Sequence, residues 1–146
     1  MGYSHYWRIE EDIAPVNFKR IQTKAMEFAA FSDVPVEINI NTLPANMSLE
    51  INGFNEDANE TFFLTPGSVS FDCCKTGQKP YDEIVVAVLN YAGHGYLTWW
   101  SDGSDFDLIS GRVLYQLAGA GLPPSLTRSE RPKDLKTVTK MEVVND

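Results

Sequence analysis

The sequence predicts an α+β fold: an antiparallel sheet of about five to six strands with two to three helices packed on one face. Short segments in which apolar and polar residues alternate follow one another closely, and this spacing is typical of an antiparallel meander. Segments with apolar residues at steps of three and four flank them and indicate amphipathic helices. The 146 residues, 43% hydrophobic and 22% charged, are typical of one globular domain. We therefore expect a single domain over residues 1–121 and an extended, partly mobile tail over 122–146.

The start of the chain predicts a strand followed by a helix. Residues 3–10 alternate, so that one strand face carries Tyr3, His5, Trp7 and Ile9 and the other carries Ser4, Tyr6, Arg8 and Glu10. A helix then begins at Pro15, and its apolar stripe consists of Phe18, Ile21, Ala25 and Phe28. Asp33 and Pro35 end this helix.

Four further strands are expected in the next part of the chain, over residues 36–41, 47–52, 61–65 and 70–74. The second helix has the clearest pattern, and its apolar residues are Tyr81, Ile84, Val85, Val88, Leu89 and Ala92. Pro80 fits its first helical position and Gly93 its end.

The last part of the domain predicts one more strand and one more helix. Residues 97–101 alternate, so Trp99 and Trp100 lie on opposite faces; one belongs to the core, and the other is a stacking platform or a cover for the outer sheet. A third helix begins at about Asp105, and its stripe consists of Phe106, Ile109, Val113 and Leu117. Residues 137–144 are compatible with a late strand.

Charge and cysteine usage limit the partners and the compartment. The net charge is −8, with −9 on residues 1–121, which opposes direct binding to nucleic acid. No apolar run reaches the roughly 18 residues of a membrane span, and the N-terminus lacks the features of a secretory signal. Cys73 and Cys74 are adjacent and rarely pair in that arrangement, so we expect a reducing, cytoplasmic location.

The segment from Cys74 to Asp82 is the main candidate for ligand binding. Lys79 precedes Pro80 and cannot cap a helix, so the start of the second helix is predicted to offer free N–H groups beside Lys75 and Lys79. Such a helix start binds anions, unless Asp82 satisfies the helix dipole itself. The predicted ligand-binding residues, which add nearby aromatic and polar side chains, are His5, Trp7, Asn55, Glu60, Lys75, Thr76, Lys79, Tyr81 and Asp102.

Metal binding and catalysis have weaker signals. Asn55, Asp57 and Asn59 match the first positions of an EF-hand loop, but Glu60 replaces its glycine, and a polar hairpin loop is preferred. Only two histidines and the adjacent cysteines offer nitrogen or sulfur ligands for zinc. Ser101, His5 and Asp102 have the residue types of a hydrolase triad but no supporting motif. We expect no metal or cofactor. A hydrolase or transferase that uses His5 with Asp102 or Glu60 is the third hypothesis for the function, after the two binding hypotheses given below.

Several short motifs resemble a family of small proteins found in bacteriophages and bacterial genomes. They are M-G-Y-S-H-Y-W-R at the start, G-F-N…N-E-T-F in the middle, C-K-T-x-x-K-P-Y-D before the second helix and S-D-G after the tryptophan pair. The likeness covers residues 1–120; the tail and the 55–59 turn depart from it. It implies a phage-type accessory protein in the bacterial cytoplasm that counters host defence, but supplies no activity.

Two binding hypotheses follow from the residues and the resemblance together. The first is a binder of a small anionic ligand, such as a nucleotide or a nucleotide-derived signal. The alternative is an acidic protein that inhibits a host factor by binding to it, and the oligomeric state is left open.

Overall fold

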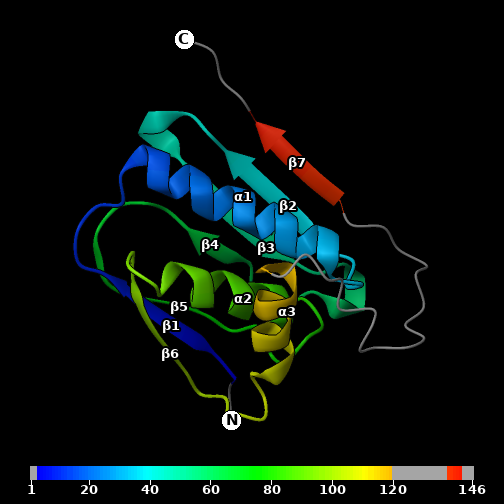
Figure 1. The fold of residues 1–146 in the computed structure, drawn as a ribbon. Helices are drawn as coiled ribbons and strands as arrows, with labels where there is room; N and C mark the ends of the chain where they lie inside the picture. Colours follow the sequence, from blue (N-terminus) through cyan, green and yellow to red (C-terminus); the bar gives the residue numbers. More distant parts are fainter. Residues whose placement is uncertain (1–2, 120–137, 143–146) are drawn as a thin grey trace.

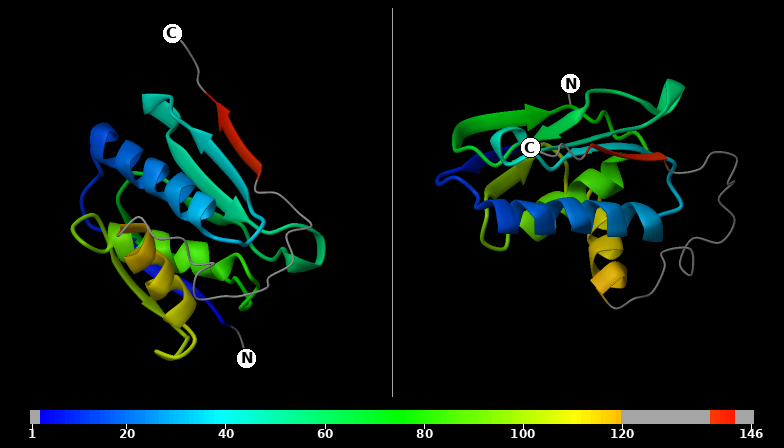
Figure 2. Two further views of the ribbon diagram at one scale, coloured as in Figure 1. Left: turned by 45° about the vertical axis from the view of Figure 1, so that its right-hand side comes forward. Right: turned by 90° about the horizontal axis from the view of Figure 1, so that it is seen from above.

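The computed structural model describes residues 3–119 and 138–142 and confirms the α+β class, with helices packed against β-sheet (Figure 1). The strands are divided between two sheets, however, and do not form the single sheet that the sequence predicts. Viewed from above, the two sheets lie on one side of the helices, and α3 lies farthest from them (Figure 2). None of the helices within residues 3–119 is long and apolar enough to cross a membrane.

The first sheet is antiparallel and has the order β5-β1-β6. Its strands are β1 (His5–Ile9), β5 (Val69–Cys74) and β6 (Thr98–Ser101). The register pairs His5 with both Cys74 and Ser101, and Tyr6 with Trp100. The predicted meander placed residues 70–74 beside the preceding strands; they pair instead with β1.

The second sheet has the order β4-β3-β2-β7. Its strands are β2 (Glu37–Asn41), β3 (Ser48–Asn52), β4 (Phe62–Leu64) and β7 (Val138–Glu142). Short 3₁₀ turns, η1 (Pro44–Asn46) and η2 (Asn55–Asp57), precede β3 and β4. The late strand is thus present, and it pairs in parallel with β2. The rest of the predicted mobile tail lies outside the described residues.

Helices α1 (Pro15–Phe31) and α2 (Asp82–Ala92) follow their predicted stripes. In α1 the four predicted apolar residues are buried, together with Gln22, whose amide donates to the carbonyl oxygens of Asn41 and Ser48. Helix α2 is buried on every side over its first two turns, so it forms the centre of the fold. It begins at Asp82 rather than Pro80, because Pro80 and Tyr81 form a turn before it.

Helix α3 (Ile109–Gly119) begins later than predicted and buries a different face. Phe106, predicted for its stripe, is 80% exposed, whereas Gly111 and Leu114 are buried. A β-carbon at position 111 would lie 2.4 Å from side-chain atoms of Val86 in α2. The close approach of α2 and α3 therefore requires glycine at this position.

Candidate functional site

A buried hydrogen-bond network joins the start of β1, the start of α2 and the end of β6. His5 Nε2 and Thr76 Oγ1 both donate to Asp82 Oδ1, at 2.5 and 2.6 Å, and the Tyr3 hydroxyl donates to Asp82 Oδ2 at 3.1 Å. His5 and Thr76 have no exposed surface, and Asp82 is buried. We call these residues and Ser101 the Asp82 network; its carboxylate has three donors, as a buried charge requires.

Ser101 extends the network to the edge of the sheet. Its Oγ lies 2.8 Å from His5 Nδ1 and accepts a hydrogen bond from the N–H of Gly103 at 2.9 Å. A carboxylate oxygen only accepts, so His5 Nε2 carries the hydrogen toward Asp82. The Tyr3 ring packs edge-on against the His5 ring and next to Gly103, which leaves no room for a β-carbon there.

A second cluster forms where the predicted motifs around Glu60 and Lys75 meet. The Glu60 N–H donates to the Lys75 carbonyl oxygen, and the Lys75 N–H donates back to Glu60 Oε1 at 2.8 Å. The buried Tyr81 hydroxyl donates to the Glu60 carbonyl oxygen at 2.5 Å. Five of the nine predicted binding residues therefore lie in these two adjacent clusters. They are held there by backbone hydrogen bonds or by buried side-chain contacts, and they are His5, Glu60, Lys75, Thr76 and Tyr81.

The start of α2 already carries negative charge. Asp82 and Glu83 occupy its first turn and are both buried. The N–H of Asp82 bonds to the Lys79 carbonyl oxygen, and the N–H groups of Ile84 and Val85 bond to that of Tyr81. Two carboxylates at this end disfavour an added anion, because they occupy the positive end of the helix dipole. The anionic-ligand hypothesis stays a prediction, with less support than the sequence suggested.

The remaining predicted binding residues lie apart from one another. Trp7 is 1% exposed and packs against Phe62 in the core. Asn55 lies in η2 with a left-handed backbone, at φ 50°. Lys79 is half-buried in the turn before α2, and Asp102 is exposed and accepts from the Tyr6 hydroxyl at 2.9 Å. Within the described part of the chain, no group of three His, Cys, Asp or Glu residues is placed to hold a metal.

The structure corrects the residue considered as the acid of a triad. Asp82, not Asp102, lies beside His5, and the order Ser101–His5–Asp82 has triad composition. His5 and Ser101 are cross-strand partners on the face of the sheet that carries buried Trp7, so the Ser101 hydroxyl points toward the interior. Ser101 is half-buried, and its hydroxyl is engaged by His5 and by the N–H of Gly103. The arrangement joins β1, β6 and α2 through side-chain hydrogen bonds.

The opposite face of this sheet carries three aromatic rings, those of half-buried Tyr6 and of exposed Phe71 and Trp100. Tyr6 stacks on Trp100, with ring centroids 5.8 Å apart, and Phe71 contacts both at 5.6 and 6.2 Å. Phe71 is 54% exposed and Trp100 43% exposed. We call these three residues the aromatic face. The sequence predicts that Tyr6 lies on the face opposite His5 and Trp7, and leaves open which of Trp99 and Trp100 is outward. Phe71 joins Tyr6 and Trp100 because β5 pairs with β1.

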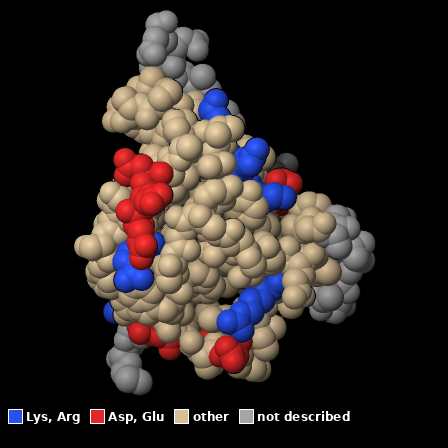
Figure 3. All heavy atoms as spheres, turned by 60° about the vertical axis from the view of Figure 1, so that its left-hand side comes forward, with Lys and Arg blue, Asp and Glu red and all other residues tan. Residues whose placement is uncertain are grey.

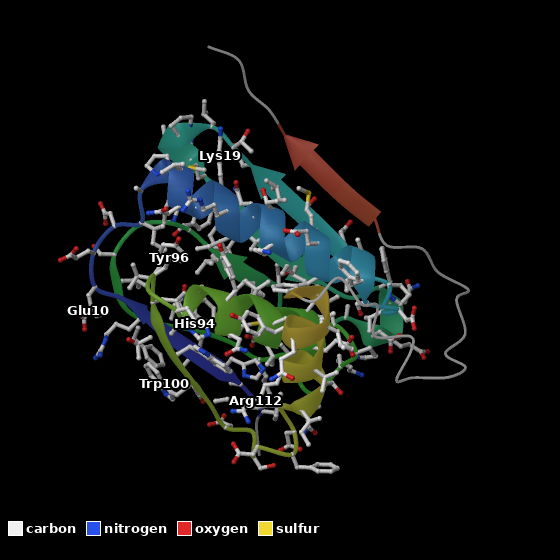
Figure 4. The ribbon with its side chains drawn as sticks, in the orientation of Figure 1. Glu10, Lys19, His94, Tyr96, Trp100 and Arg112 are labelled. Carbon is white, nitrogen blue, oxygen red and sulfur yellow. The ribbon has the colours of Figure 1, made fainter. Side chains whose placement is uncertain are left out.

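An open groove of about 560 Å³ adjoins the aromatic face at Arg8 and Thr98. Three acidic residues, Glu10, Glu11 and Asp12, line it, and Tyr96 lies across from them. Figure 4 places Glu10, Tyr96 and Trp100 on the same side of the molecule. Figure 3 brings that side forward and shows acidic side chains gathered in a cluster with a basic group beside it. We call this the acidic groove.

The Cys74 thiol and the Tyr81 hydroxyl are buried near Glu60, and we therefore expect the protein to lose stability at alkaline pH. Burial, with Glu60 and Asp82 nearby, raises the pKa of Cys74 to about 12, and burial with Cys74 and Asp82 nearby raises the pKa of Tyr81. The unfolded chain ionises these groups at lower pH, so above about pH 9 the folded state holds more protons and its stability falls as pH rises.

Urea unfolding at pH 7.5, 9 and 10.5 measures this effect. Each group contributes a fall of up to about 1.4 kcal/mol per pH unit once its unfolded form has ionised. The variant Cys74→Ala is expected to lose stability less steeply between pH 9 and 10.5. An unchanged unfolding free energy across this range would contradict the prediction.

Sequence reasoning missed Tyr3 and Phe71 as partners and Asp82 as the centre of the buried network, whereas it grouped Ser101 with His5 and took Asp102 as the acid. The sequence indicates for Asp82 a place in the motif before the second helix and a role in satisfying the helix dipole, but neither points to His5 or Tyr3. No protein-family model, curated protein or solved structure matches this chain, so the resemblance to phage and bacterial proteins stays an expectation.

Proposed function

We propose that the protein is a binding module that recognises a partner protein with a basic surface through its aromatic face. The observation that carries this proposal is the cluster of Tyr6, Phe71 and Trp100, whose rings contact one another on the open side of the sheet. Tyrosine, tryptophan and phenylalanine are enriched in protein interfaces, and exposed apolar patches mark such sites.

The charge of the molecule supports a basic partner. Residues 1–121 carry a net charge of −9, and acidic side chains line the groove next to the aromatic face. Opposite charge speeds association and excludes partners of like charge. In the setting that the resemblance implies, the partner is a host factor, and binding blocks the surface with which that factor works.

Site-specific photo-crosslinking tests the proposal. A photoreactive phenylalanine analogue at position 71 is expected to form one discrete crosslinked product in bacterial lysate, because Phe71 lies at the interface. The same analogue at exposed Glu56, in η2, is the matched control and is expected to form none. The product should disappear when Trp100→Ser is added and weaken in high salt. Equal crosslinking from positions 71 and 56 would overturn the proposal.

A further inference from the structure

Strand β6 lies at an edge of the first sheet. Among residues 3–119 and 138–142 its only strand neighbour is β1. Thr98 and Trp100 are exposed, and Trp99 and Ser101 are half-buried. An edge strand presents N–H and C=O groups along its free side, and these can pair with an added strand.

The free edge of β6 is continuous with both recognition features. Trp100 belongs to β6 and to the aromatic face, whereas Thr98 belongs to β6 and lines the acidic groove. A strand added to β6 would therefore have Trp100 beside its outward side chains and would reach the groove beyond Thr98. The β6 edge joins the two features into one surface.

The chemistry of the groove selects cationic side chains. Glu10 pairs with Arg8 at 3.4 Å, with both side chains largely exposed, and Asp12 Oδ1 accepts from the Ser68 N–H. Glu10, Glu11 and Asp12 outnumber the one arginine of the groove, so its lining is net negative. The Tyr96 ring at the same groove offers a surface on which a guanidinium group can stack.

We propose that the partner binds as an extended, arginine-bearing segment that pairs with the free edge of β6 and places its guanidinium groups in the acidic groove. This inference rests on the proposed function and names the partner's chemistry. Main-chain hydrogen bonds to β6 supply affinity without sequence preference, and the groove selects positive charge. The aromatic face contacts the apolar side chains of the same segment.

A synthetic peptide tests this inference with the full-length protein. The probe is a peptide of about nine alternating Thr and Val residues, long enough to follow β6 and enter the groove, with a pair of arginines at one end. A second peptide carries the arginines at the other end, because either strand direction is compatible with an edge. Control peptides carry glutamate in place of arginine.

Calorimetric titration and amide hydrogen exchange give the expected results. One arginine peptide binds saturably, the glutamate peptides do not, and binding protects amides within residues 98–101. The double variant Glu10→Gln/Glu11→Gln is expected to weaken binding about tenfold at low salt, a loss of about 1.4 kcal/mol. The matched control Glu56→Gln/Asp57→Asn removes the same charge from η2 and should leave the Kd unchanged.

Two results would overturn the inference. The first is that neither arginine peptide binds. The second is that one of them binds with equal affinity to the groove variant and to the η2 control variant and does not protect residues 98–101. In either case crosslinking from position 71 still reports on the proposed function by itself. If the peptide binds but position 71 forms no crosslink, the arginine-bearing segment stays supported as the ligand of β6, and the aromatic face is excluded from the proposed interface.

Discussion

Replacing Asp82 with alanine is expected to lower the free energy of unfolding by about 3–5 kcal/mol. The substitution leaves the His5 Nε2–H and the Thr76 and Tyr3 hydroxyls without their acceptor, and His5 and Thr76 are fully buried. Buried donors that lose their partner cannot recover it from water, so the full desolvation cost appears in the folded state. Urea unfolding followed by circular dichroism measures the loss.

Asp102→Ala is the matched control, because it is the same chemical change at the residue that follows Ser101, the other end of the network. The side chain of Asp102 is exposed and accepts a hydrogen bond from the Tyr6 hydroxyl at the surface, so the expected change is within about 0.5 kcal/mol. In a His5→Ala background, Asp82→Ala should cost less than in the native protein, because the two side chains share one interaction. Additive losses would show that His5 and Asp82 are not energetically coupled, and equal effects at positions 82 and 102 would show that the network does not stabilise the fold.

Trp7→Ala is expected to lower the free energy of unfolding by about 3–5 kcal/mol. Trp7, in β1, is 1% exposed, and the centroid of its ring lies 5.0 Å from that of Phe62 in β4. Truncation therefore leaves a large cavity between these two strands, which belong to different sheets. The sequence placed Trp7 among the ligand-binding residues. The structure instead predicts that its loss affects folding directly, which a urea unfolding curve measures.

Trp100→Ala is the control for Trp7→Ala, since both remove an indole from the same three-stranded sheet. Trp100 is on the outer face and 43% exposed, so its loss is expected to cost less than about 1 kcal/mol while impairing partner binding. The conservative variant Trp7→Phe retains part of the buried ring and is expected to fold. Equal destabilisation at positions 7 and 100 would contradict the assignment of the two faces.

The local pattern of the sequence was sufficient to assign faces but not to pair strands. Alternation over residues 3–10 correctly separates buried His5 and Trp7 from outward Tyr6 and Arg8, because the side-chain period of a strand is two. The same rule correctly places Trp99 and Trp100 on opposite faces. Pairing depends on contacts between distant segments, so neither the division into two sheets nor the place of Phe71 beside Tyr6 was predictable.

Helix α3 and the Asp82 network show why the rest of the site was missed. The face of α3 is decided by the close approach of Gly111 to Val86, whereas hydrophobic periodicity counts glycine as neutral and favoured Phe106. Asp82 was read as a residue that satisfies a helix dipole. Of its three partners, Thr76 is nearby in the sequence, but His5 and Tyr3 precede Asp82 by 77 and 79 residues, and no spacing rule connects positions so far apart.

The central place of β1 in its sheet has a consequence for the order of folding. This strand leaves the ribosome before either of its neighbours, yet β5 ends at Cys74 and β6 at Ser101. Residues 5–9 can therefore pair with β5 only after residue 74 has been synthesised, and with β6 only after residue 101. Closure of such long loops slows folding, and chaperones that bind exposed apolar segments have their best opportunity on the nascent chain during this interval.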